Sequence, residues 1–189
     1  MGPTPEVGRR LLHLGGVVFP LAYLFELVTW TDLQLLYVGG SALAILLEGL
    51  RLGVGVDWSL FERLTRDYER SNVAGYALYT FSSTAVILAF DPRIALPGVL
   101  MLVIGDPVSG LLGASGPGET KEPLVLAITF GVCLGIALVF ADPIPAGLGA
   151  AAATIADGTT PVLGGHVIDD NLTIPPAAAG AIWIGGQVV

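Results

Sequence analysis

The feature that most limits the fold of this chain is the recurrence of apolar stretches long enough to cross a bilayer. A transmembrane α-helix needs about 17–25 predominantly apolar residues. Seven stretches of about this length fill nearly the whole sequence: residues 7–28, 33–52, 72–90, 94–114, 124–141, 145–161 and 173–189. Only 13 % of the residues are charged, whereas soluble domains carry about 25 %. We therefore predict an all-α, polytopic integral membrane protein of about seven helices, forming one domain over residues 1–189.

The distribution of positive charge predicts the orientation of these helices. Lys and Arg favour cytoplasmic loops, and a cytoplasmic N-terminus places nearly all of them on that side. These residues are Arg9, Arg10, Arg51, Arg63, Arg66, Arg70 and Lys121, whereas Arg93 falls outside. We therefore expect a multi-pass protein of the cell membrane with its N-terminus in the cytoplasm. The net charge of −8 argues against nucleic acid as a partner, because binding its phosphates requires many Lys and Arg side chains.

A polar segment at about residues 53–71 separates the second and third apolar stretches. Four apolar residues recur in it at helical spacing: Trp58, Phe61, Leu64 and Tyr68. Such a pattern predicts an amphipathic helix that lies on the cytoplasmic membrane surface. We expect its role to be structural.

Asp106 lies inside the fourth apolar stretch. A carboxylate at that depth is costly unless it is paired, hydrated or bound to a cation. Pro107 follows it, has no backbone N–H and clashes with the carbonyl group of Val103. We therefore expect the helix to break or kink at Asp106, and irregular backbone within a membrane is tolerated only where it lines a protein cavity. The position predicts a functional site inside the membrane.

The predicted topology brings the other unusual polar residues to the cytoplasmic half as well. They are Arg10, His13, Glu48, Asn72, Ser109, Lys121, Asp157, Asp170 and Asn171. Two of them have simpler interpretations: Glu48 could form an interfacial ion pair with Arg51, and His13 could be an ordinary helix-end residue. Carboxylates suit Mg²⁺, which takes oxygen ligands from protein and phosphates, and Lys121 could meet a phosphate. Apolar cavity walls favour a lipid alcohol or lipid phosphate as the acceptor.

Three short motifs resemble those of the dolichol kinase and phytol kinase family. Residues 105–113 read Gly-Asp-Pro-Val-Ser-Gly-Leu-Leu-Gly, which resembles that family's Gly-Asp-x-x-small-small-x-x-Gly segment. Residues 170–175, Asp-Asn-Leu-Thr-Ile-Pro, are similar to its Asp-Asn-Leu-x-x-Pro signature, and residues 9–13 to its N-terminal basic-x-x-His motif. The order and spacing agree over nearly the whole chain. The chain is also distantly similar to CTP-dependent phosphatidate cytidylyltransferases.

The resemblance implies an integral membrane kinase that transfers phosphate from CTP to a long-chain isoprenoid alcohol with a divalent metal such as Mg²⁺. By this resemblance the catalytic residues are Asp106, Asp157, Asp170 and Asn171, with Asp157 in the place of a usual Glu. Asp106 and Asp170 are then the metal ligands. We expect substrate binding by a second set of residues: Arg10, His13, Glu48, Asn72, Ser109 and Lys121.

The sequence is compatible with more than one donor, function and general base. The loop at residues 114–123 is shorter than the family's and retains one basic residue, Lys121, so either CTP or ATP could be the donor. A lipid cytidylyltransferase is one alternative, although a more basic loop would be expected to hold its triphosphate. A transporter or lipid-binding protein that uses Asp106 as a cation or proton site is another. Asp157 and His13 are both candidates for accepting the proton of the alcohol.

Overall fold

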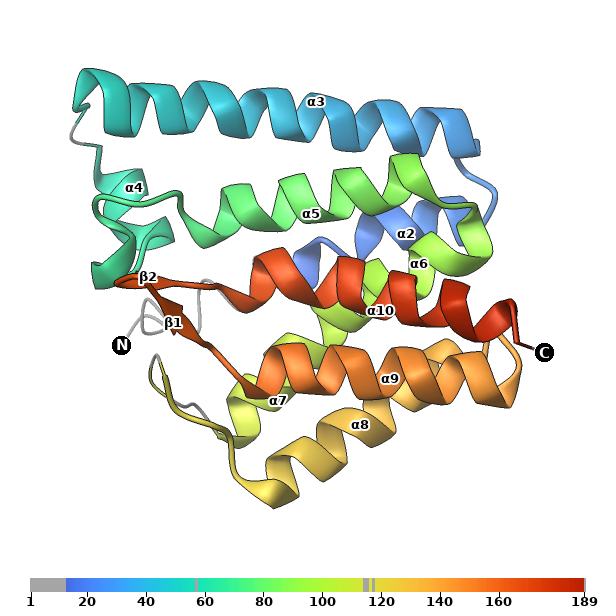
Figure 1. Cartoon of the computed structure of the whole chain (residues 1–189). Coiled ribbons are helices and arrows are strands. Elements are labelled where there is room, and N and C mark those ends of the chain that lie inside the picture. Colours follow the sequence, from blue (N-terminus) through green and yellow to red (C-terminus); the bar gives the residue numbers. More distant parts are fainter. Residues whose placement is uncertain (1–12, 57, 114–115, 117, 189) are drawn as a thin grey trace.

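The computed structural model describes residues 13–56, 58–113, 116 and 118–188. The chain is mostly helical, which confirms the predicted all-α class (Figure 1). The α-helices are α2 (Val18–Leu24), α3 (Trp30–Glu48), α4 (Ser59–Leu64), α5 (Gly75–Ala89), α6 (Pro92–Leu100), α7 (Asp106–Leu112), α8 (Pro123–Ala137), α9 (Pro143–Gly158) and α10 (Asp170–Gly186). Two π-helical segments, Gly49–Val54 and Met101–Gly105, a 3₁₀ turn at Asp67–Glu69 and a small hairpin of β1 (Val162–Leu163) and β2 (His166–Val167) complete the described elements.

Two continuous helices in the described part of the chain, Trp30–Val54 and Pro92–Leu112, are long and apolar enough to cross a membrane. They coincide with the second and fourth predicted stretches. The other predicted stretches form helices too, but shorter or less apolar ones, such as Gly75–Ala89 and Pro123–Ala137. The prediction of spanning helices is thus confirmed, by length and composition, for these two.

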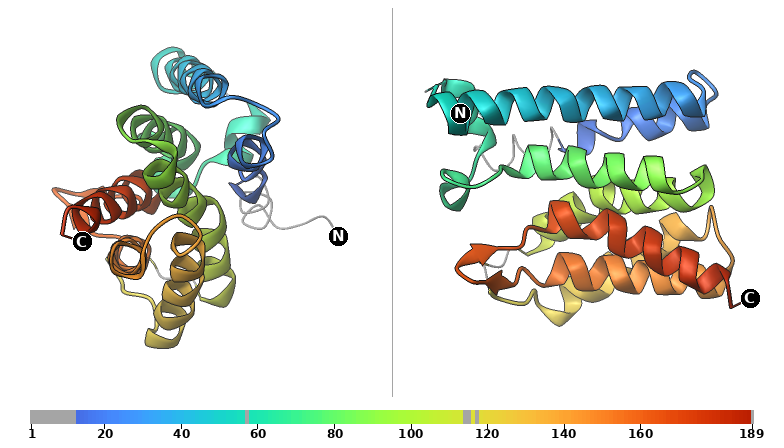
Figure 2. Two further views of the ribbon diagram at one scale, coloured as in Figure 1. Left: turned by 90° about the vertical axis from the view of Figure 1, so that its right-hand side faces the viewer. Right: turned by 45° about the horizontal axis from the view of Figure 1, so that its top comes forward.

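Helix α10 and the helix built from α6 and α7 form the centre of the bundle, whereas α3 lies at its edge (Figure 2). Helix α10 packs against α9, α5 and α6. Small residues allow this close packing: a Cβ atom at Gly98 would lie 2.9 Å from the carbonyl oxygen of Pro175, and one at Gly149 would overlap Ile182. Helix α3 packs chiefly on α5, so most of its surface faces away from the protein.

The fourth helix does not break at Asp106, but its regular α-helical hydrogen bonding is interrupted by a π-helical segment directly before that residue. Helix α6 runs through the π-helical segment Met101–Gly105 directly into α7, and Gly105 and Asp106 keep right-handed helical φ values of −65° and −61°. The wider π turn accommodates Pro107. Proline has no backbone N–H, and the π turn shifts the hydrogen bonds of the preceding carbonyl groups away from the position where an α-helix would need one. Asp106 is therefore held on a rigid, continuous helix.

The predicted amphipathic helix over residues 53–71 is shorter than expected. Helix α4 ends at Leu64, where Thr65 turns extended and its hydroxyl group donates to the carbonyl oxygen of Phe61 at 2.7 Å. The Arg66 backbone N–H then donates to Glu69 Oε2 at 2.9 Å. These side-chain bonds replace helical ones and turn the segment inward, toward the start of α10.

Candidate functional site

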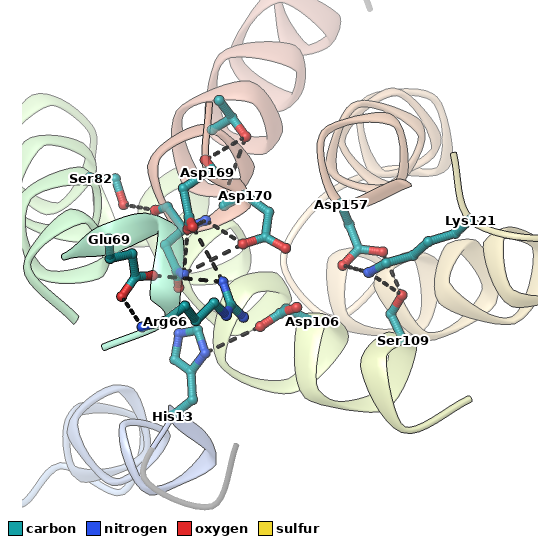
Figure 3. A network of polar contacts seen from close by, with 12 residues as sticks. His13, Arg66, Glu69, Ser82, Asp106, Ser109, Lys121, Asp157, Asp169 and Asp170 are labelled. Atoms are coloured by element: carbon teal, nitrogen blue, oxygen red, sulfur yellow. Dashed lines mark hydrogen bonds and ion pairs between the residues drawn. The ribbon is translucent and has the colours of Figure 1, made fainter. Parts of the chain in front are cut away.

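Three carboxylates meet between the end of α9, the start of α10 and the middle of the continuous α6–α7 helix, and we call them the carboxylate cluster. Asp106 begins α7, Asp157 lies in the last turn of α9, and Asp170 begins α10. Each offers an oxygen atom, and these oxygens lie within 4.8 Å of one another (Figure 3). The prediction that these distant aspartates converge is confirmed.

The cluster has the donor chemistry that Mg²⁺ requires. Mg²⁺ binds oxygen at about 2.0–2.1 Å and usually keeps several waters, so two direct ligands on one ion are at most about 4.2 Å apart. The 4.8 Å limit slightly exceeds this distance, so one carboxylate would bind through water or move inward by a few tenths of an ångström. The three aspartates can therefore hold one divalent cation.

Lys121 neutralises one member of the cluster. Its ammonium nitrogen lies 2.9 Å from Asp157 Oδ1 and 2.9 Å from Ser109 Oγ, and Ser109 donates to Asp157 Oδ2 at 2.6 Å. Lys121 and Asp157 are both buried. The predicted site residues Ser109 and Lys121 thus lie in the site, but Lys121 is bound inside it rather than free in a loop. Asp106 and Asp170 remain as the better direct ligands for a metal.

His13 contacts the cluster from the N-terminal helix. Its Nδ1 lies 3.2 Å from Asp106 Oδ2, and its ring stands edge-on to Tyr79 with 4.9 Å between the ring centroids. The other ring nitrogen, Nε2, is buried and has no hydrogen-bond partner in the part of the chain that the structure describes. A neutral imidazole that donates from Nδ1 to a carboxylate presents an acceptor at Nε2.

The start of α10 is fixed by Asp169, which sequence reasoning did not select. Asp169 Oδ1 accepts hydrogen bonds from the Asn171 backbone N–H at 3.0 Å and from Asn171 Nδ2 at 2.6 Å. Ser82 donates to the carbonyl oxygen of Asn171 at 2.6 Å. The side-chain oxygen Oδ1 of Asn171 is buried without a partner among the described residues. Asn171, a predicted catalytic residue, is therefore rigidly placed beside Asp170 with one acceptor left over.

The segment between α4 and α5 supplies three further residues of the site. Arg66 Nη1 lies 3.3 Å from Asp169 Oδ2 and 2.7 Å from the Tyr68 hydroxyl oxygen, and the Tyr68 hydroxyl donates to Asp169 Oδ2 at 2.9 Å. Burial and the nearby Asp169 carboxylate raise the pKa of Tyr68 well above its usual range, so this phenol stays protonated. Glu69 is buried beside them. No local pattern shows these contacts, since they join residues about a hundred positions apart.

A cavity of about 300 Å³ opens onto this polar group. Its polar wall consists of His13, Arg66, Glu69, Asp106 and Asn171. The rest of its wall comes mainly from apolar parts of α3, α4 and α5: Gly40, Leu43, Ala44, Leu47, Leu64, Gly75, Tyr76, Tyr79 and Thr80. The cavity is therefore amphipathic, with charged and polar side chains on part of its wall and largely apolar ones on the rest.

Glu48 belongs to a different network. It accepts two hydrogen bonds from Arg51, at 3.0 Å and 2.6 Å, one from the Ala74 backbone N–H at 3.2 Å and a short one from the Tyr76 hydroxyl. Arg51 also donates to the carbonyl oxygen of Asn72 at 2.6 Å. The alternative interpretation of Glu48 as ion-paired with Arg51 is thus confirmed, although the Arg51 side chain is only 8 % exposed.

Asn72 contacts this network through its carbonyl oxygen, and its side chain donates to the carbonyl oxygen of Tyr68 at 2.9 Å. Neither Glu48 nor Asn72 is among the described residues that line the cavity. Both were predicted to bind substrate. In the structure their side chains instead bind backbone groups of the loop before α5. Arg10, also predicted to bind substrate, lies outside the described residues.

No protein-family model, curated protein or solved structure matches this chain. The geometry of the site combines three clustered carboxylates, an imidazole nitrogen without a partner among the described residues, and an amphipathic cavity.

Proposed function

We propose that this protein is a multi-pass membrane kinase that phosphorylates a long-chain isoprenoid alcohol in a Mg²⁺-dependent reaction, with CTP as the expected donor. The observation that carries the proposal is that one member of the carboxylate cluster, Asp106, lines a partly apolar cavity while the other two lie close to it. A phosphorylated donor requires the metal, and an alcohol with a hydrocarbon chain suits the apolar wall.

The outer surface of the bundle supports membrane insertion through more than two helices. Large apolar side chains are exposed on peripheral and central helices alike: Leu35, Ile45 and Leu46 on α3, Leu124 on α8, Ile155 on α9, and Trp183 and Ile184 on α10. Soluble proteins rarely expose continuous apolar surface of this kind. A bilayer around the bundle would cover these side chains.

The cavity also offers a route for the acceptor. Leu43 lines the cavity and is 55 % exposed on α3, so the cavity wall can be reached from the outer face of that helix. A hydrocarbon chain can lie between α3 and α5 while its hydroxyl group reaches Asp106 and His13. The small volume suits the head end of a long chain, whose remainder would stay in the bilayer.

In the proposed reaction the alcohol oxygen attacks the γ-phosphorus, the bond from that phosphorus to the β–γ bridging oxygen breaks, and the nucleoside diphosphate leaves. Asp106 and Asp170 would hold Mg²⁺, which would neutralise the charge on the phosphate oxygens. His13 is better placed than Asp157 to accept the hydroxyl proton, because its Nε2 has no partner among the described residues, whereas both Asp157 oxygens already accept hydrogen bonds. Asp157 then positions Ser109 and Lys121.

Transfer of label from γ-labelled CTP to isoprenols of increasing length, by the purified protein in detergent with Mg²⁺, tests the proposal. Asp106→Asn should lower the transfer rate at least ~100-fold, the scale for loss of a key electrostatic stabiliser. Glu122→Gln, a change at an exposed residue, is the matched control. A loss of less than tenfold in folded Asp106→Asn protein would contradict the assignment. Labelling from ATP alone would change the donor, and pyrophosphate release would indicate a cytidylyltransferase.

A further inference from the structure

The donor phosphates need a cationic partner, and the residue predicted for this role is already engaged. The side chain of Lys121 is 7 % exposed and bound to Asp157, whereas the side chain of Arg66 is 32 % exposed and lines the cavity. We infer that Arg66 is the phosphate-binding residue of this site, with Tyr68 and Asp169 as its positioning residues. The inference rests on the proposed function, because it assigns the contact of the nucleotide donor within the same site.

The guanidinium group of Arg66 lies at the centre of the polar wall. Figure 3 shows it between Asp169 and Asp170 on one side and Asp106 on the other. A phosphate bridged to these aspartates by a divalent cation would therefore lie within reach of Arg66.

The hydrogen bonds of Arg66 leave one edge of its guanidinium group open. In the described chain its side-chain contacts to Tyr68, Glu69 and Asp169 all use Nη1. Its Nε and Nη2 hydrogens point along the other edge and have no partner among the described residues. Because that edge presents two parallel donors, it matches the two oxygens of a phosphate.

A second arginine in the same protein shows what this edge does when it is occupied. Arg51 uses its Nε and Nη2 atoms to hold both oxygens of Glu48, at 3.0 Å and 2.6 Å. Arg66 has the equivalent pair of donors without the carboxylate. The comparison indicates that a bidentate oxyanion is the ligand that completes Arg66.

Tyr68 and Asp169 fix the orientation of that open edge. The Tyr68 hydroxyl accepts from Arg66 and donates to Asp169, and Asp169 caps the helix that begins with Asp170. The phosphate-binding edge and a predicted metal ligand are thus anchored to one helix terminus. Preorganised donors of this kind stabilise the charge that develops on a transferred phosphoryl group.

The test is direct binding of phosphate compounds to the full chain in lipid nanodiscs. Calorimetry would compare Mg²⁺-CTP, Mg²⁺-ATP and Mg²⁺-pyrophosphate for wild type, Arg66→Gln and Arg66→Lys, with the thermal midpoint of each variant as a check on folding. We expect Arg66→Gln to weaken binding roughly 10- to 100-fold, the range for loss of hydrogen bonds to a charged group. Arg93→Gln, at an exposed residue in the first turn of α6, should bind as wild type does.

Two results would overturn the inference: a folded Arg66→Gln protein that binds within threefold of wild type, or a wild type that binds none of the three compounds. If Arg66→Gln fails to fold, Arg66→Lys decides. Lysine keeps the charge beside Asp169 but lacks the bidentate edge, so we expect binding about tenfold weaker, and unchanged binding would overturn the inference.

The positioning role of Tyr68 has its own readout. Tyr68→Phe removes both hydroxyl bonds but leaves the charge of Arg66, so we expect weaker nucleotide binding than in wild type and stronger than in Arg66→Gln. Binding that depends on Arg66 without transfer to any isoprenol would support the inference and overturn the proposed kinase. Phosphate transfer to an isoprenol that Arg66→Gln does not change would support the proposed kinase and overturn the inference about Arg66.

Discussion

Two charged networks lie at the same end of this bundle, and they differ in how completely their charges are neutralised. The Glu48–Arg51 pair balances one carboxylate with one guanidinium and uses its remaining donors on the loop before α5. The carboxylate cluster holds Asp106, Asp157 and Asp170 together, and Lys121 neutralises Asp157 alone. The first network is balanced by its own groups, whereas the second keeps more carboxylates than Lys121 can neutralise.

The difference separates a structural role from a binding role. Every charged group of the Glu48–Arg51 pair has a partner within the protein, so nothing remains to recognise a ligand. Around the cluster, His13 Nε2 and Asn171 Oδ1 are buried without partners in the described chain. Buried polar atoms are normally hydrogen-bonded, so atoms that are not point to an interaction with something else.

The largest effect on stability should come from the Glu48–Arg51 pair. Glu48→Gln leaves Arg51 buried without its counter-ion, and breaking a buried pair costs about 3 kcal/mol or more of unfolding free energy. Reversible unfolding in detergent measures this loss, with the exposed Glu122→Gln as the control. A loss below about 1 kcal/mol would mean that the pair is not the main support of the loop.

The carboxylate cluster should respond to metal instead. Mg²⁺ at a hundred times its dissociation constant should stabilise the folded protein by about 2.7 kcal/mol, visible as a higher thermal midpoint that EDTA reverses. Asp170→Asn should abolish this increment because it removes a direct ligand. Glu48→Gln should keep it, since that residue lies in the other network. An increment that survives Asp170→Asn would remove the cluster as the metal site.

Lys121 is the cation that neutralises one carboxylate of the cluster, Asp157. Lys121→Met leaves Asp157 buried without its counter-ion, so we expect a loss of about 2 kcal/mol of unfolding free energy. Adding Asp157→Asn should recover part of the loss, because the unpaired charge disappears. Nucleotide affinity should fall less than in Arg66→Gln. A larger fall than in Arg66→Gln would make Lys121 the phosphate ligand.

The smallest effect should come from Gly75, which lies between the networks at the start of α5. A Cβ atom there would lie 3.0 Å from Asn171 Nδ2 and 3.2 Å from Glu69 Oε1, so both side chains must shift slightly. The gain in helix propensity, up to about 1 kcal/mol, offsets this strain. We therefore expect Gly75→Ala to keep its stability but lose transfer rate several-fold, because small misplacements cost catalysis.

Gly131→Ala on α8 is the control for this change, since an added Cβ there meets no atom within 4 Å. It should leave both the unfolding free energy and the transfer rate unchanged. An equal loss of rate in both variants would show that the effect does not come from Asn171.

The sequence by itself determined the helical class, the long helices Trp30–Val54 and Pro92–Leu112, and the meeting of the three aspartates. These features follow from costs that one segment carries alone. Unpaired backbone in an apolar environment forces helices, and a carboxylate such as Asp106 in an apolar stretch must find a partner.

Only the tertiary structure decided which groups meet those aspartates. The contacts of Arg66 and Tyr68 with Asp169, the burial of Lys121 against Asp157, and the separate network of Glu48 all depend on how helices dock. Such pairings join residues far apart in the chain, and their energies depend on distances that no local pattern contains. The amino-acid sequence therefore identified where charge needs a partner, and the packing of α4, α5 and α10 selected the partner.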